Sequence, residues 1–328
     1  MKSPARYVPV HLARGTPHVM LDSLPVPGSV LTLSHWPGAV NPIRIESDTS
    51  TGIVLDFLGQ GGSLADVGAC TAVHFDIDGL LALHVALGRS AGYDASPVRD
   101  LARAGDFGTA TTARARRGVF ALDAATVAAG AGIGLAPGAR RTAATYQRML
   151  GWLGEHFEAL HAGTLAPSWW AAGERHYERS ARLLDSADAP SPRFGTDEMS
   201  AVELPADDRP WPARLYFGLD PFAVHERCPA LAVLVSRGGQ HQLVQRYEGW
   251  VQGHDPAWAR RRDLAPLRDY LHARDPEAGW RYAGVYHPFA RLETGAGRAS
   301  ALSTETLRGL VSRFHATTAP GWHPLLID

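Results

Sequence analysis

The chain of 328 residues is 45% hydrophobic and 20% charged, with a formal net charge of −1 at pH 7. This composition is typical of a soluble protein with a substantial core, and the length favours two domains over one. The near-zero charge gives no electrostatic reason to expect nucleic-acid or membrane partners, and no run of about 18 apolar residues is present to span a bilayer. Residues 1–20 lack the apolar stretch of a signal peptide, so we expect a cytoplasmic protein.

The sequence lacks the characteristic motifs of several familiar enzyme classes. It contains no Gly-x-Ser-x-Gly elbow, no Walker loop, no dinucleotide fingerprint and no Cys/His zinc spacing. Cys70 and Cys228 are too few and too far apart for a disulfide framework or a thiolate metal site. These absences argue against serine hydrolases, P-loop NTPases and dehydrogenases with a Rossmann domain.

The N-terminal part predicts an α/β domain over residues 1–135. Residues 1–27 are interrupted by prolines and predict irregular chain. A β-rich run follows at 29–35, and the polar cluster 48–51 precedes a predicted helix over 52–58. A second strand at 70–75 leads into a helix over 80–87. Strands that alternate with helices through short loops are typical of a parallel sheet covered by helices.

The remaining chain predicts a helical segment and then an α+β region. A helix over 97–104 should end at Gly105, and the Ala/Gly-rich stretch 130–138 should be a loop. Apolar residues at helical spacing in 146–160, and a second helix over 167–184, define a helical segment over 136–190. The proline-rich, acidic stretch 186–212 is the predicted domain boundary or an exposed connection between elements. The C-terminal region, 191–328, predicts a β-hairpin over 231–251 that turns at Gly238-Gly239, with helices over 262–273 and 304–316.

The segment from His74 to Gly79 carries the clearest chemical signal. His74, Asp76 and Asp78 occupy every second position, so an extended chain would direct all three side chains to one side. One imidazole and two carboxylates suit a divalent cation. The alternative is that the aspartates cap the following helix. We favour a metal or catalytic role because clustered acidic groups are rarely buried without a cation.

Three further residues are predicted to join this cluster. His35 also follows a strand, so it should emerge at the same carboxyl edge of a parallel sheet, where ligands bind. Asp48 lies near a helix start that should face this edge, and Asp106 lies in a predicted loop beside Gly105 and Gly108. Each has a structural alternative: a histidine in a turn, an N-cap and an ordinary loop aspartate.

The C-terminal region offers one candidate for binding an anion. Residues 246–250 alternate charged and aromatic side chains on a predicted strand, beginning with Arg246. Arg246 could face an anionic substrate, or it could pair with a carboxylate across the sheet.

Two resemblances can be read from these motifs. Residues 34–38 (SHWPG), 48–50 (DTS), 74–79 (HFDIDG), 104–108 (AGDFG) and 246–252 (RYEGWVQ) resemble a family of uncharacterised bacterial proteins, which implies no activity. The HFDIDG segment is also similar to the first motif of the DHH phosphoesterases. That resemblance implies a parallel α/β domain, a pair of Mn²⁺ or Mg²⁺ ions bound through His74, Asp76 and Asp78, and hydrolysis of phosphoester or phosphoanhydride bonds. The chain has no Asp-His-His triplet, and residues 238–241 do not match the later glycine–histidine motif.

The sequence therefore predicts a metal-dependent hydrolase, such as a phosphoesterase, that acts on a small anionic substrate. One or two Mn²⁺ or Mg²⁺ ions would be held at the carboxyl edge of the sheet and would activate water. Two alternatives stay open: a non-catalytic protein that binds a metal or a small molecule, and a non-hydrolytic enzyme of specialised metabolism. The predicted metal ligands are His74, Asp76, Asp78, Asp106 and Asp48, and the predicted catalytic residues are His35, His74 and Arg246.

Overall fold

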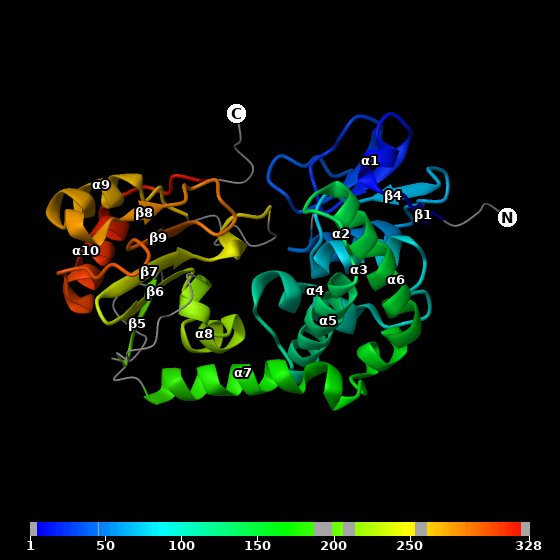
Figure 1. Cartoon of the computed structure of the whole chain (residues 1–328). Coiled ribbons are helices and arrows are strands. Elements are labelled where there is room, and N and C mark those ends of the chain that lie inside the picture. Colours follow the sequence, from blue (N-terminus) through cyan, green and yellow to red (C-terminus); the bar gives the residue numbers. More distant parts are fainter. Residues whose placement is uncertain (1–4, 45, 187–198, 206–213, 253–260, 323–328) are drawn as a thin grey trace. The chain divides into compact units, whose positions relative to one another are not determined.

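The computed structural model describes residues 5–44, 46–186, 199–205, 214–252 and 261–322. The chain divides into two compact units (Figure 1). The first comprises the described residues up to Glu174 together with Val251 and Gln252, and the second comprises the other described residues from Arg175 onward. Among the described residues, no helix is both long enough and apolar enough to cross a membrane.

The first unit contains a parallel sheet with helices packed on it, as predicted. The strand order is β1-β4-β2-β3, and every pair is parallel. Helix α3 packs against β2 and β4, and α2 packs against β3. The strands are β1 (Arg6–Tyr7), β2 (His18–Leu21), β3 (Ser29–Leu33) and β4 (Ala69–Thr71), and the helices are α1 (Val10–Ala13), α2 (Ser50–Gly59), α3 (Ile77–Ala86), α4 (Ala95–Phe107), α5 (Ala113–Ala131) and α6 (Ala139–Ala162).

The prediction that residues 1–27 are irregular is wrong, because β2 lies inside this stretch and between β3 and β4. All four residues of β2 are buried. A strand that is covered on both faces has no polar–apolar alternation, so its sequence lacks the signal by which half-buried strands are recognised. The consequence for function is that the residue after β2, Asp22, joins the carboxyl edge of the sheet.

Two predicted boundaries next to the candidate site are also wrong. Strand β4 ends at Thr71, and α3 begins at Ile77 with Asp76 as its N-cap, so Asp78 lies in the first turn of a helix rather than on an extended chain. Helix α4 does not end at Gly105 but continues to Phe107, which places Asp106 in its last turn. A Cβ on Gly105 would lie 2.5 Å from Cγ2 of Ile77, so this glycine permits the close packing of α3 and α4. Helix α5 has no counterpart among the predictions from sequence.

The second unit contains a mixed sheet with the order β5-β6-β7-β9-β8, in which β5 is parallel to β6 and the other pairs are antiparallel. Its strands are β5 (Met199–Leu204), β6 (Ala232–Arg237), β7 (Gln240–Gln245), β8 (Arg281–Tyr282) and β9 (Arg291–Glu293). Its helices are α8 (Pro221–Arg227), α9 (Ala265–Arg274) and α10 (Thr304–Thr317), with short 3-10 turns η1 (Leu215–Gly218), η2 (Tyr247–Gly249) and η4 (Pro276–Ala278). Helix α7 (Pro167–Ser186) begins in the first unit and ends in the second.

The predicted hairpin is confirmed, and its turn explains the glycine pair. Gly238 and Gly239 have φ values of 52° and 76°, which side chains disfavour and which the tight turn between β6 and β7 requires. Strand β7 ends at Gln245, so Arg246 precedes the η2 turn instead of continuing the strand. Part of the predicted connection, 199–204, is strand β5, whereas residues 187–198 and 206–213 lie outside the described residues.

Candidate metal centre

Six acidic and imidazole side chains meet at the carboxyl edge of the parallel sheet. Asp22 follows β2, His35 follows β3, and His74 lies in the loop after β4. Asp76 and Asp78 open α3, and Asp106 comes from the last turn of α4. The sheet edge thus unites residues that are up to 84 positions apart (Asp22 to Asp106), and the predicted grouping of His35, His74, Asp76, Asp78 and Asp106 is observed.

Asp22 lies at the centre of the cluster. Its Oδ1 is 3.3 Å from Nε2 of His35, and its Oδ2 is 3.2 Å from Nε2 of His74. The hydroxyl of Ser50 donates a 2.7 Å hydrogen bond to Oδ1. The backbone of Asp22 has a φ of 48°, a left-handed conformation that aspartate tolerates better than most residues. This conformation begins the short connection from β2 to β3 and keeps the side chain at the sheet edge.

The His35 side of the cluster is closed to solvent. His35 is fully buried, and its Nδ1 lies 2.7 Å from the backbone carbonyl of Asp48. A donor at Nδ1 directs Nε2 toward the carboxylates of Asp22 and Asp78, the latter 3.9 Å away. This carbonyl therefore determines which ring nitrogen faces the cluster.

Asp78 does act as a helix cap, but for α2 rather than for its own helix. Its carboxylate accepts hydrogen bonds from the backbone N–H groups of Ser50 (2.7 Å) and Thr51 (2.9 Å), at the start of α2. These two bonds hold the carboxylate in place beside Asp22. Because a carboxylate oxygen can accept more than one bond, this capping does not exclude metal binding.

The other side of the cluster is open. The side chains of His74 and Asp76 are 34% and 36% exposed, and His74 Nε2 lies 2.5 Å from Asp76 Oδ2. The other oxygen of Asp76 accepts a 2.7 Å hydrogen bond from the N–H of Gly79 and so caps α3. The ring of Trp36 lies beside that of His74, with their centroids 5.0 Å apart. A ligand would therefore approach the cluster from the side of His74 and Asp76.

Asp106 borders the closed side. Its side chain is 7% exposed, and Oδ2 lies 3.6 Å from Nδ1 of His35. Within the described part of the chain, this buried oxygen has no hydrogen-bond partner. A buried carboxyl oxygen without a donor is energetically costly unless it is protonated or near a cation.

Gly79 and Tyr146 pack closely beside the open side of the cluster. The phenol of Tyr146, a fully buried residue of α6, donates a 2.5 Å hydrogen bond to the carbonyl of His74. A Cβ on Gly79 would lie 2.6 Å from this hydroxyl and 3.0 Å from Oδ2 of Asp22. The glycine of the HFDIDG segment is thus explained by the close approach of a tyrosine and a carboxylate, since its own φ is not positive.

The electrostatics of the cluster are dominated by acidic groups. Burial acts to lower the pKa of His35, but the carboxylates of Asp106 and Asp22 outweigh it and raise this pKa to about 10. For His74, burial is likewise outweighed by hydrogen bonds to Asp22 and Asp76, which raise the pKa to about 11.

The carboxyl groups respond to the same surroundings. Burial acts to raise the pKa of Asp22, but the two imidazoles hold it below its usual range. Burial, reinforced by the charge of Asp22, raises the pKa of Asp78 to about 7. Among the described residues, no arginine or lysine pairs with any carboxylate of the cluster, namely Asp22, Asp76, Asp78 and Asp106. Among the described residues, the two imidazoles are therefore the only basic side chains that pair with these four carboxyl groups.

Two overlapping sets of side chains can hold a metal ion. Asp22, His74 and Asp76 form one set, and Asp22, His35 and Asp78 form the other. Within each set, one ligand atom from every residue lies within 4.8 Å of the others. Asp22 belongs to both sets, and imidazole nitrogen with carboxylate oxygen is a donor combination that suits divalent transition metals.

Two predicted residues occupy other surroundings. The carboxylate of Asp48 lies 3.4 Å from Arg103, and Thr49, not Asp48, caps α2 through its side chain. Arg246 belongs to the second unit, where its buried guanidinium donates a 3.2 Å hydrogen bond to the carboxylate of Glu248. The assignment of Asp48 as a ligand and of Arg246 as an anion clamp stays a prediction.

Asp22 is the one member of the cluster that is not among the residues predicted from the sequence, and neither is Ser50, which donates a hydrogen bond to it. The signal for Asp22 is present in the sequence: the apolar run Val19-Met-Leu21 is followed directly by Asp22 and Ser23. An acidic residue immediately after a short, uniformly apolar run is the pattern of a buried parallel strand that ends at a ligand site.

The chain belongs to a family of unknown function (DUF6687), whose family model matches residues 3–325. This agrees with the resemblance to uncharacterised proteins that the motifs indicate. No curated protein and no solved structure matches the chain significantly.

Proposed function

We propose that this member of the family is a metal-dependent hydrolase whose ion is bound around Asp22. The observation that carries the proposal is the grouping of four carboxyl groups around two imidazoles, with no described arginine or lysine paired with them. Grouping carboxylates in a largely buried site is unfavourable unless a cation offsets their repulsion. Mn²⁺ is the ion we expect, because Mg²⁺ is less suited to imidazole ligands.

The surrounding chain is built to orient these ligands. The carbonyl of Asp48 directs Nε2 of His35 inward, the hydroxyl of Ser50 holds Asp22, and the first amides of α2 hold Asp78. Such outer contacts fix ligand geometry in metal sites. They support a site that is preorganised for binding one or two ions.

The exposed side of the cluster supports catalysis rather than a purely structural ion. A structural site is usually closed by protein ligands, whereas a catalytic one keeps a position for water and substrate. The partly exposed side chains of His74 and Asp76 offer such an opening. A bound ion would supply water of lowered pKa and would stabilise charge on a phosphoryl oxygen. We therefore propose a small anionic substrate, with phosphoesters as the first class to test.

The first experiment measures Mn²⁺ binding to the full chain by titration calorimetry after removal of bound metal. We expect Asp22→Asn to weaken binding by at least about a hundredfold, since a ligand should matter no less than the outer contacts whose loss costs 10–100-fold. Asparagine suits this test because it also tolerates the left-handed backbone at position 22. Asp94→Asn is the matched control: Asp94 is an exposed N-cap in the same unit, and asparagine caps helices equally well.

The outcomes separate the alternatives. If the wild-type protein binds no Mn²⁺, or if Asp22→Asn binds it as the wild type does, the proposed site is refuted. A panel of phosphomonoesters, phosphodiesters and pyrophosphate then tests hydrolysis by the Mn²⁺-loaded protein. Tight binding of the ion without turnover of any of these would favour a non-catalytic protein or a non-hydrolytic enzyme over a phosphoesterase.

A further inference from the structure

We propose that the first unit also carries a binding site for a small aromatic carboxylate, formed where α5 begins, α6 ends and α7 begins. A cavity of about 160 Å³ lies there. It shares no residue with the metal cluster, so the proposal does not depend on the hydrolase. The walls that matter for recognition come from Arg114, Arg117, Leu160, Leu165 and Trp170.

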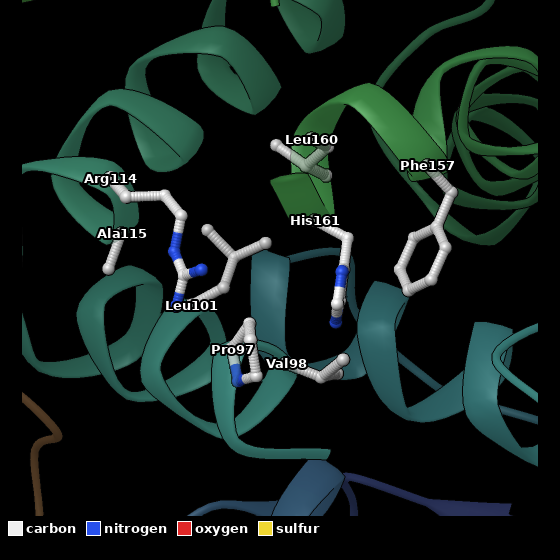
Figure 2. Close-up of a pocket in the computed structure, with 8 residues that line it drawn as sticks. All are labelled: Pro97, Val98, Leu101, Arg114, Ala115, Phe157, Leu160 and His161. Carbon is white, nitrogen blue, oxygen red and sulfur yellow. The ribbon is translucent and has the colours of Figure 1, made fainter. Parts of the chain in front are cut away.

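An adjoining pocket shares Arg114 and Leu160 with this cavity but is already filled by side chains. It measures only about 10 Å³, roughly the space of one water molecule. Figure 2 shows Arg114 reaching into it from α5 and His161 reaching into it from α6, above apolar residues of α4. Nε2 of His161 lies 2.9 Å from the carbonyl of Asp94, so its polar group is already engaged. The larger cavity is therefore the one that can receive a ligand.

Two arginines, Arg114 and Arg117, line this cavity. Three arginines lie in the first two turns of α5, and Glu174 pairs with two of them, Arg116 at 3.1 Å and Arg117 at 3.4 Å. Arg114 has no hydrogen bond or ion pair with any residue in the described ranges. It also lies in the first turn of a 19-residue helix, where the helix dipole favours an anion. Arg114 reaches toward the smaller pocket in Figure 2, but it lines both pockets and has no partner among the described residues, so its guanidinium can turn to a carboxylate bound in the larger cavity.

The remaining walls are apolar and aromatic. The guanidinium of Arg117 lies 4.4 Å from the centroid of the Trp170 ring, and Nε1 of Trp170 donates a 3.0 Å hydrogen bond to the carbonyl of Leu165. These contacts fix the indole as a flat wall beside Leu160 and Leu165. The volume of the cavity, about 160 Å³, is similar to that of an engineered cavity of about 150 Å³ that binds benzene in another protein. A single aromatic ring with one carboxylate matches this size, shape and charge.

The test is titration calorimetry of the full chain with benzoate, and with benzyl alcohol as the neutral compound of similar size. We expect one benzoate to bind per chain and benzyl alcohol to bind at least about tenfold more weakly, a difference of about 1.4 kcal/mol. Arg114→Ala should weaken benzoate binding by a similar factor. Arg140→Ala, which removes an exposed arginine of α6 outside the cavity, should leave it unchanged.

A second variant tests the location of the site without removing charge. Ala162 lines the rim of the cavity and is exposed, so Ala162→Phe should fill the cavity, abolish benzoate binding and leave the fold intact by circular dichroism. The proposal is overturned if benzoate at about 10 mM does not saturate the wild-type protein, because the dissociation constant of a specific site should lie well below that concentration. It is equally overturned if Arg114→Ala or Ala162→Phe binds benzoate as the wild type does. None of these results bears on Mn²⁺ binding at Asp22.

Discussion

Replacing Gly79 by alanine is the sharpest test of how the open side of the cluster is packed. The new Cβ would lie 2.6 Å from the hydroxyl of Tyr146 and 3.0 Å from Oδ2 of Asp22. Tyr146 cannot move freely, because it is fully buried, its hydroxyl is bonded to the carbonyl of His74, and its ring contacts those of Tyr7 and Phe75. The substitution should therefore displace Tyr146 or shift the start of α3.

The size of the effect follows from three opposing contributions. Glycine to alanine inside a helix stabilises by about 1 kcal/mol. Forcing extra volume into a packed core costs about 1–3 kcal/mol, and weakening the buried hydrogen bond of Tyr146 costs about 1 kcal/mol more. We expect Gly79→Ala to lower the free energy of unfolding by about 1–3 kcal/mol.

The assay is urea unfolding of the full chain with a matched control in the same unit. Gly151 lies inside α6, and a Cβ there would meet no atom within 4 Å, so Gly151→Ala should stabilise by about 0.5–1 kcal/mol. Tyr146→Phe removes the closest clashing atom, so in that background the cost of Gly79→Ala should shrink by at least about 1 kcal/mol. If Gly79→Ala stabilises as Gly151→Ala does, or if Tyr146→Phe leaves its cost unchanged, the described packing is incorrect.

Three other predictions address the neighbouring elements. Gly105→Ala should destabilise by about 1–3 kcal/mol in thermal unfolding, since its Cβ would lie 2.5 Å from Cγ2 of Ile77; a neutral result would contradict the close packing of α3 and α4. Asp78→Ala removes the acceptor of two amides at the start of α2 and should cost about 1–2 kcal/mol in urea unfolding, and an unchanged midpoint would argue against this cap. Burial lowers the pKa of His84 from 6.5 to about 4. Between these two pH values the unfolded chain binds more protons than the folded chain, so the free energy of unfolding should fall by about 3 kcal/mol as the pH drops from 6.5 to about 4. His84→Leu should remove that part of the acid sensitivity in urea unfolding at several pH values, whereas His272→Leu, at an exposed position, should not; equal pH slopes for wild type and His84→Leu would show the assignment to be wrong.

Much of the N-terminal architecture followed from local patterns. The alternation of strand and helix runs predicted the parallel sheet, and the shared carboxyl edge predicted that His35 and His74 would meet. These predictions were correct because they depend on a general property of parallel sheets and not on exact boundaries. The boundaries themselves are less well predicted: the helix of Asp106 runs past Gly105, because this glycine is the small residue that packing against Ile77 requires and not a helix end.

The centre of the candidate site was not predicted. Asp22 follows a four-residue strand within a proline-containing stretch, and no periodicity marks it. Strand β2 exists because β3 and β4 pair with it on both sides, which is a property of the assembled sheet. Likewise, nothing in the local sequence indicates that Asp78 would cap α2, because the two elements are adjacent only in the folded unit.

The sequence by itself determined the class of fold and most of the acidic and imidazole residues of the cluster, since ligand-type residues at strand ends and helix starts are a local feature. The tertiary structure decided which of these residues meet, that Asp22 joins both possible ligand sets, and which side of the cluster is open. The physical reason is that a metal site depends on distances of a few ångströms between side chains from different elements. Those distances are fixed by packing. Here they depend on the buried strand β2, on Tyr146 packed against Gly79, and on Asp78 of α3, whose carboxylate caps α2.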